Sequence, residues 1–194
     1  GMYNIGYQNY AAAGKLADAT FIEMFAYGFL ALLPKLLVSY LVGLGIEFAW
    51  AQMKKEEIQE GYLVSGILIP LIIPINCPLW ILALAVAFSV IFVKEIFGGT
   101  GMNIFNVALA ARAFMFFSYP TEMSGDSVWV ARDTIFGLGN TLPDTFTQAT
   151  PLALVSKGID SGYGISDMVF GFIPGSVGET SVIAIAIGAL ILLI

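Results

Sequence analysis

The side chains able to support redox chemistry are few in this sequence. It has no histidine and one cysteine, Cys77. Haem and imidazole-bound metals therefore lack their usual ligand, and a single thiol holds neither an iron–sulfur cluster nor an internal disulfide. Hydroxyl and carboxylate groups do gather at residues 144–150, Asp-Thr-Phe-Thr-Gln-Ala-Thr. If this protein transfers electrons, an organic cofactor must carry them.

The segment 144–150 resembles the flavinylation signature Asp-x-x-Ser/Thr-Gly-Ala-Thr, whose last threonine carries FMN through a phosphoester bond. This resemblance implies covalent FMN on Thr150, with Asp144 and Thr147 at two further signature positions. The Asp144 carboxylate would help a flavin transferase to hold metal and substrate. Gln148 departs from the signature, which has glycine at that position. The alternative is a threonine-rich loop that matches by chance.

A second candidate site lies in residues 97–106, Phe-Gly-Gly-Thr-Gly-Met-Asn-Ile-Phe-Asn, and begins with a glycine-rich box at 97–101. Three glycines of the box permit positive φ and the close approach of a ligand: Gly98, Gly99 and Gly101. A helix that begins near Met102 would aim free N–H groups at that ligand and place Asn103 and Asn106 on one face. Carboxamides match the imide edge of a flavin ring. The alternative is close helix packing, with asparagine forming interhelical hydrogen bonds.

The box and its continuation at 107–114, Val-Ala-Leu-Ala-Ala-Arg-Ala-Phe, resemble the B subunit of the Na⁺-translocating NADH:quinone reductase, which is related to the D subunit of the Rnf-type electron-transport complex. Other matching stretches follow in order along the chain: Met2-Tyr3-Asn4, Glu60-Gly61, Pro78-Leu79-Trp80, Lys94-Glu95, Tyr119-Pro120, Ser124-Gly125-Asp126 and 173–179. Thr100 and the Ser-Gly-Asp stretch at 124–126 favour the sodium pump. Val107 and Ala111 depart from the proline and glycine that are common in its box.

The resemblance implies a redox chain with two flavins. Electrons would pass from a flavin in a partner subunit to FMN on Thr150, then to a noncovalent riboflavin held by Asn103 and Asn106, and then to quinone. Glu47 matches an intramembrane glutamate implicated in sodium uptake. The alternative for Glu47 is an interfacial carboxylate that is neutralised by Lys54 or paired with another subunit.

Other residues of the apolar runs match a family position, need a partner or serve in packing. Gly43 matches the first of two glycines at the family's quinone region, and Leu44 replaces the second. Arg112 lies in an apolar run and needs a partner, for which flavin phosphate, Asp126 and a neighbouring subunit are the alternatives. Three aromatic side chains that follow it are interpreted as packing and lipid contacts: Phe114, Phe116 and Phe117.

Composition predicts a membrane protein. Hydrophobic residues make up 58% of the chain and charged residues 11%, with a mean hydropathy of +0.87. Soluble domains carry about 25% charged residues. A net charge of −6 leaves no basic surface for nucleic acid. We predict an all-α integral membrane protein, a multi-span helical bundle with broken helices, and the resemblance adds a transporter-like inverted repeat.

Apolar runs and their interruptions define the expected order of segments. Residues 1–20 are small and polar and are interpreted as a surface segment, whereas 21–119 hold transmembrane helices. The expected spans, with their proline interruptions, are 21–53 (Pro34), 62–76 (Pro70 and Pro74), 79–97 and 104–119. Residues 120–178 form a polar, loop-like segment, and 179–194 begin a further span that is cut short. We expect the chain to be part of a larger polypeptide.

Basic residues set the expected orientation. Lys54 and Lys55 place their loop in the cytoplasm, and counting spans forward puts the 120–178 loop, with Thr150, on the extracytoplasmic side. The expected location is the bacterial cytoplasmic membrane. Expected partners are the lipid bilayer, the other subunits, quinone, Na⁺ and, during maturation, the flavin transferase.

The predicted function is that of one subunit of a Na⁺-translocating NADH:quinone oxidoreductase. The chain would not be an enzyme alone, because it has no dinucleotide-binding fingerprint. Two alternatives remain. One is the D subunit of an Rnf-type complex, whose electron partner is ferredoxin, and the other is a solute channel of similar scaffold without redox function. A covalent flavin excludes the channel.

Overall fold

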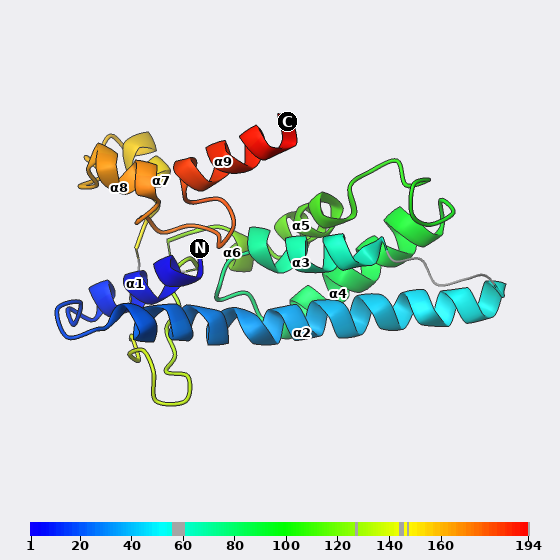
Figure 1. The fold of residues 1–194 in the computed structure, drawn as a ribbon, viewed down its shortest axis with the longest axis horizontal. Coiled ribbons are helices and arrows are strands. Elements are labelled where there is room, and N and C mark those ends of the chain that lie inside the picture. The colour runs from blue at the N-terminus through cyan, green and yellow to red at the C-terminus, as the bar shows by residue number, and fades with distance from the viewer. Residues whose placement is uncertain (56–60, 127, 144–145, 147, 194) are drawn as a thin grey trace. The chain divides into compact units, whose positions relative to one another are not determined.

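Helices are the main regular secondary structure of the described residues. A computed structural model describes residues 1–55, 61–126, 128–143, 146 and 148–193, so that Glu60, Asp144 and Thr147 lie outside the described residues. The described residues form helices and no strand, apart from an isolated β-bridge between Ile135 and Leu138, which confirms the predicted all-α class. In chain order the helices are α1 (Met2–Ala12), α2 (Phe21–Lys54), α3 (Tyr62–Ile72), α4 (Leu79–Phe88), the π-helix η1 (Ser89–Glu95), α5 (Val107–Ser118), α6 (Pro120–Met123), α7 (Pro151–Ser156), α8 (Ile165–Phe170) and α9 (Val182–Leu193) (Figure 1).

The chain divides into two compact units. The terminal unit comprises Gly1–Leu32, Pro74–Asn76 and Gly125–Ile194, and the central unit comprises Leu33–Ile73 and Cys77–Ser124. Thr150 therefore belongs to the terminal unit. Glu47 and the glycine-rich box at 97–101 belong to the central unit.

Helix α2 forms where the first span was predicted. Its 34 residues continue through Pro34 as one helix. At 1.5 Å per residue the helix is about 50 Å long, which exceeds the roughly 30 Å of a bilayer's hydrocarbon core. Among the described residues it is the one helix both long and apolar enough to cross a membrane, whereas α3, α5 and α9 are apolar but shorter.

The second and third predicted spans differ from the helices that form. Helix α3 ends at Ile72 because Ile73, held extended at φ −96° and ψ 158°, precedes Pro74, which disfavours the helical conformation there. The third span is α4 followed by η1, where the Ile96 N–H donates to the Ile91 carbonyl at 3.1 Å. That five-residue spacing defines the wider turn of a π-helix.

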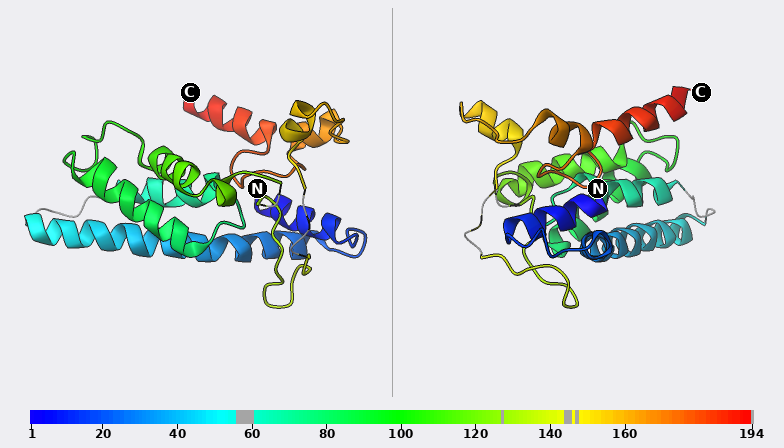
Figure 2. Two further views of the ribbon diagram at one scale, coloured as in Figure 1. Left: turned by 180° about the vertical axis from the view of Figure 1, so that it is seen from behind. Right: turned by 60° about the vertical axis from the view of Figure 1, so that its left-hand side comes forward.

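The core of the central unit lies between α3, α4, η1 and α5. Its fully buried side chains include Tyr62, Ile69, Ile73, Ile81, Leu82, Val86, Val90 and Met115. Ala108 and Ala111 of α5 are buried in the same cluster, and such small side chains let helices approach closely. Figures 1 and 2 show α5 alongside α3 and α4.

The terminal unit begins with a helix that the sequence pattern did not indicate. We expected residues 1–20 to be a surface segment, but α1 forms there and buries Asn4, Gln8 and Asn9. Asn9 donates to the carbonyls of Ala131 and Asn140 at 2.8 and 2.9 Å, and accepts from the Asn140 N–H at 2.7 Å. Apart from Ile5 and Gly6, the buried residues of α1 are polar, so they leave no apolar period in the sequence.

Residues 120–178, expected to be loop-like, contain three short helices among their described parts. These helices are α6, α7 and α8, of four to six residues each. The apolar run near the end of the chain forms the 12-residue helix α9.

Candidate functional site

Thr150 is the N-cap residue of α7. Its backbone is extended, at φ −66° and ψ 153°, and Pro151 takes the first helical position. The Oγ1 atom accepts a hydrogen bond from the Ala153 N–H at 3.3 Å. Capping requires only a lone pair on this oxygen, so an ester at Oγ1 remains compatible with the same hydrogen bond.

A cavity of about 470 Å³ opens beside Thr150 in the terminal unit. Trp129, Pro151 and Met168 line one part of it, and residues 173–176 with Glu179 and Thr180 line another. A cavity of this size is in the range of small-molecule sites, and an indole beside it offers a face for a planar ring. The structure thus brings Thr150 together with the 173–179 stretch, which lies more than twenty residues further along the chain.

Hydrogen bonds fix the backbone just before Thr150. The Gln148 side chain donates to the Tyr163 hydroxyl at 2.7 Å and to the Gln8 carboxamide oxygen at 3.2 Å. Its backbone N–H donates to the Asp126 carbonyl at 2.7 Å. Gln148, which departs from the flavinylation signature, therefore connects α1 and Tyr163 to the loop that carries Thr150. No sequence pattern indicated this role.

The glycine-rich box has the backbone conformation that its composition predicted. Gly98, Gly99 and Gly101 adopt φ values of 112°, 88° and 89°, so each lies in the region that favours glycine. The predicted start of the following helix near Met102 is wrong, because α5 begins at Val107.

Asn106 sets that later start. Its Oδ1 accepts from the N–H groups of Ala108 and Leu109 at 2.9 and 3.1 Å, which makes it the N-cap of α5. Asn103 lies outside the helix, and its Nδ2 donates to the Phe105 carbonyl at 2.9 Å. The two asparagines therefore do not share a helix face. Asparagine side chains favour caps and turns over helix interiors, which explains the difference.

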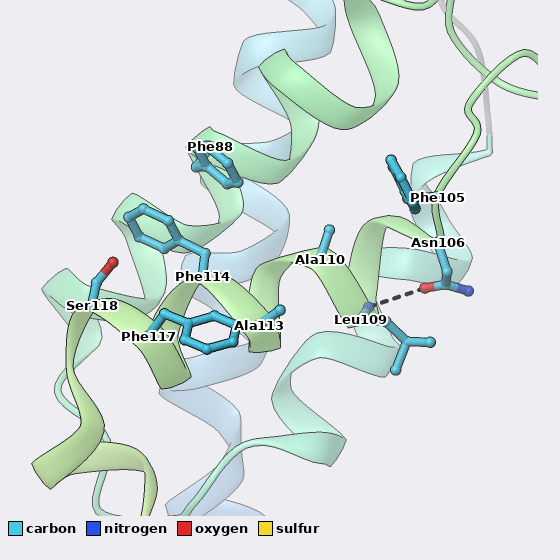
Figure 3. A pocket seen from close by; sticks show the side chains of 9 residues that line it. All are labelled: Phe88, Phe105, Asn106, Leu109, Ala110, Ala113, Phe114, Phe117 and Ser118. Atoms are coloured by element: carbon cyan, nitrogen blue, oxygen red, sulfur yellow. Dashed lines mark hydrogen bonds between the residues drawn. The ribbon is translucent and has the colours of Figure 1, made fainter.

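A second cavity, of about 600 Å³, lies in the central unit along α5 (Figure 3). Asn106 and Phe105 lie at one end, and Phe114, Phe117 and Ser118 lie at the other (Figure 3). The Asn106 oxygen is used by the cap, while its Nδ2 remains the donor that this carboxamide can direct toward a ligand.

The aromatic side chains of this cavity also pack on one another. Phe88 and Phe114 are stacked, with ring centroids 4.6 Å apart and an interplanar angle of 19°. The packing role expected for Phe114 is confirmed, and both Phe114 and Phe117 also line the cavity.

Gly43 and Glu47 lie one turn apart on α2 and are both buried. A Cβ atom added at Gly43 would overlap the ring of Tyr62. The Tyr62 hydroxyl in turn donates to the Ser39 carbonyl at 3.1 Å. The absence of a side chain at Gly43 thus lets α2 contact Tyr62 of α3.

Glu47 has a partner that the sequence interpretation did not name. It forms a salt bridge with Lys94 of η1, and the exposed fractions of the two residues are 4% and 3%. The alternative in which Lys54 neutralises Glu47 is wrong, since Lys54 lies over the Trp50 ring, with its Nζ 5.4 Å from the ring centroid. The sequence feature that could have indicated this salt bridge is Lys94 itself, a lysine within an apolar run.

Comparisons with known proteins identify the family. The family described as "NQR2, RnfD, RnfE family" matches residues 2–194. The B subunit of the Na(+)-translocating NADH-quinone reductase of Ectopseudomonas mendocina (strain ymp) is 40% identical over 220 positions, which cover 100% of this chain and 52% of that protein. The corresponding protein of Chromohalobacter salexigens is 40% identical over 217 positions, which cover 100% and 50%.

A shorter match reaches a higher identity. The protein of the same name from Stutzerimonas stutzeri (strain A1501) is 44% identical over 178 positions, which cover 89% of this chain and 40% of that protein. The chain therefore spans about half the length of the curated relatives it matches. Because the family match extends over residues 2–194, the chain belongs to the NQR2, RnfD, RnfE family.

Proposed function

We propose that this chain is part of a membrane subunit of a respiratory sodium pump. In this proposal it passes electrons through covalent FMN on Thr150 and a noncovalent riboflavin toward quinone, with coupled Na⁺ translocation. The observation that carries the proposal is the placement of the Thr150 hydroxyl at a 470 Å³ cavity, in a chain whose relatives are named as the B subunit of the Na(+)-translocating NADH-quinone reductase.

The FMN proposal is supported by the chemistry around Thr150. Thr150 is half-buried, and its Oγ1 atom keeps a lone pair for the cap. Trp129 offers the cavity an aromatic surface on which an isoalloxazine ring could stack. When bound, FMN would supply the one- and two-electron redox chemistry that the protein's own side chains lack.

The riboflavin proposal is supported by the cavity along α5. Its phenylalanines provide apolar and aromatic contacts, and the Asn106 amide provides a donor at one end (Figure 3). A flavin without a phosphate needs such contacts more than it needs positive charge. Asn103 is a further donor near the box, but its amide hydrogen-bonds to Phe105.

Further parts of the proposal concern the whole complex. NADH oxidation takes place in a partner subunit, and a flavin transferase attaches the FMN. The complete protein has an inverted helical repeat and resides in the bacterial cytoplasmic membrane, with the Thr150 loop on the extracytoplasmic side. Gly43 belongs to the quinone region, and Glu47 takes up Na⁺.

The attachment of FMN is tested by fluorescence of the denatured subunit. The full-length subunit is co-expressed with its partner subunits and a flavin transferase, and run on a denaturing gel. We expect a fluorescent band that disappears in Thr150→Ala and persists in Ser156→Ala, a control at the other end of α7 whose hydroxyl donates to the Ala153 carbonyl. A dark band from membrane-inserted wild-type protein contradicts the flavin proposal and favours the solute channel.

The Rnf-type alternative differs in its electron donor. The family description names both NQR2 and RnfD, so the match alone does not choose between them. Quinone reduction by the purified complex with NADH supports the sodium pump, whereas flavin reduction by reduced ferredoxin supports the Rnf-type complex.

A further inference from the structure

Three charged side chains meet within the central unit. Glu47 of α2 and Lys94 of η1 form a salt bridge, and the side chain of each is 3% exposed. The Glu95 Oε1 atom lies 3.8 Å from the same Lys94 ammonium, and the Glu95 side chain is 12% exposed. Two carboxylates and one ammonium give this cluster a net charge of minus one when all three are ionised.

The π-helix explains how Lys94 comes to be buried. Buried side chains on α4 and η1 recur in adjacent pairs every four residues: Ile81 and Leu82, Ala85 and Val86, Ser89 and Val90, Val93 and Lys94. An α-helix has 3.6 residues per turn, so a four-residue repeat would rotate away from one face. The wider turn of η1 keeps Lys94 on the buried face. Lysines near helix ends often extend their ammonium group to water. The Lys94 side chain instead stays buried.

One carboxylate oxygen of Glu47 does not pair with Lys94. Oε1 pairs with Lys94, whereas Oε2 is buried and has no hydrogen-bond partner among the residues that the structure describes. An unpartnered carboxylate oxygen in a cluster with excess negative charge is suited to a small monovalent cation. A cation at Oε2 would share its carboxylate with the ammonium of Lys94. Two positive charges at that separation repel each other, and more strongly in a buried site than in water.

We propose that Lys94 is a built-in competitor of Na⁺ for the Glu47 carboxylate. This inference rests on the proposed function, in which Glu47 takes up Na⁺. Binding of the ion weakens the contact of Lys94 with Glu47, and return of the ammonium to the carboxylate promotes release of the ion. Glu95 holds the ammonium while the ion occupies Glu47. Lys94 is thus a positioning residue that sets the affinity of the site for Na⁺.

The test uses the assembled complex and its Na⁺-dependent quinone reduction. Lys94→Met removes the charge and keeps an unbranched side chain, and Lys94→Arg keeps the charge. We expect Lys94→Met to lower the KM for Na⁺ by about fivefold or more, the lower end of typical coupling between two sites, and to lower kcat because the ion leaves slowly. Lys94→Arg should stay within about twofold of wild type in KM, well inside that coupling range.

Glu95→Gln provides an independent test with the opposite sign. Without its second carboxylate, Lys94 remains on Glu47, so the KM for Na⁺ should rise. This variant also keeps the proposal testable if Lys94→Met fails to assemble, which flavin content and subunit composition will reveal. A merely structural role for Lys94 would lower the yield of complex without these opposite shifts in KM.

The outcomes separate the two proposals. A wild-type complex whose quinone reduction shows no stimulation by Na⁺ overturns the proposed function. Stimulation in the wild type with an unchanged KM for Na⁺ in Glu95→Gln and in assembled Lys94→Met overturns the role of Lys94 alone.

Discussion

At Gly43, one missing side chain decides how closely two helices approach. The Tyr62 ring occupies the space that a Cβ atom would need, and Tyr62 is fully buried with its hydroxyl bonded to Ser39. This contact gives Gly43 a packing role in addition to the proposed quinone role. The two roles predict different effects for the same substitution, because packing affects stability whether or not quinone binds.

Gly43→Ala should destabilise the protein by about 1–3 kcal/mol, since the added methyl group overpacks a filled interface. Gly45→Ala is the matched control: it lies on the same helix, is exposed and has no neighbouring atom within 4 Å of the place that its Cβ would take. Thermal unfolding of the purified complexes, followed by flavin fluorescence, measures both. Equal stability of the two variants would contradict the packing role.

Gln148 is a second single residue whose substitution has a predictable effect, here on the loop that carries Thr150. Gln148→Gly restores the glycine of the flavinylation signature, so covalent FMN should be retained. It also removes the hydrogen bonds to Gln8 and Tyr163, so backbone amides at 148–154 should exchange hydrogen faster. Hydrogen exchange with mass spectrometry measures the change.

Tyr163→Phe removes one of these two hydrogen bonds and should give an intermediate rate. Exchange rates equal to wild type in both variants would show that other contacts hold this loop.

At the scale of elements, α5 shows how a cap and a proposed ligand donor can reside in one side chain. The Asn106 oxygen caps α5, and Asn106 is one of the residues that line the cavity (Figure 3). Asn106→Leu therefore removes the cap and the proposed donor together. If Asn106→Leu were the only variant tested, a loss of riboflavin could result from unwinding of the first turn of α5 and not from loss of the donor.

Asn106→Asp separates these functions, because a carboxylate caps as well as a carboxamide but donates no hydrogen bond when ionised. We expect Asn106→Asp to lose noncovalent riboflavin while it keeps covalent FMN and wild-type stability. Asn106→Leu should lose riboflavin and also about 1 kcal/mol of stability. Flavins released by acid precipitation, measured against the covalent fraction, give the result. Full riboflavin content in Asn106→Asp would remove Asn106 from the site.

At the scale of the molecule, the rate at which Cys77 is alkylated reports whether the chain is folded. It is the one cysteine of the chain, it is 2% exposed, and its carbonyl accepts from the Lys35 ammonium at 2.7 Å. Cys77 lies in the connection between α3 and α4, where burial raises the pKa of its thiol above the usual value; Lys35 opposes that shift and Glu122 adds to it.

Alkylation proceeds through the thiolate, and a raised pKa lowers the thiolate fraction at every pH below it. Iodoacetamide should therefore label the native chain slowly at about pH 8, with a rate that continues to rise above about pH 9, and label it fast in denaturing detergent. Mass spectrometry of the subunit counts the label. Equal rates in the native and denatured protein would show that Cys77 is accessible in the folded state.

Several features could be predicted because they depend on nearby residues alone. Positive φ at Gly98, Gly99 and Gly101 follows from the glycines themselves, and α2 follows from an apolar run of sufficient length. The start of α5 was predicted wrongly although its determinant, the cap at Asn106, is also local. A helix whose buried residues are mostly polar, such as α1, gives no apolar period, so its packing could not be predicted by pattern.

The sequence by itself determined the all-α class, the membrane character, the family and the candidate FMN threonine, because composition, helix-length apolar runs and short motifs are properties of contiguous residues. Only the tertiary structure decided that Lys94 pairs with Glu47, that Gln148 contacts Gln8, and that the 173–179 stretch lies at the cavity of Thr150. These partners are separated by tens of residues or more along the chain. Their meeting depends on helix packing and on the π-helical turn that keeps Lys94 buried, which no local pattern specifies.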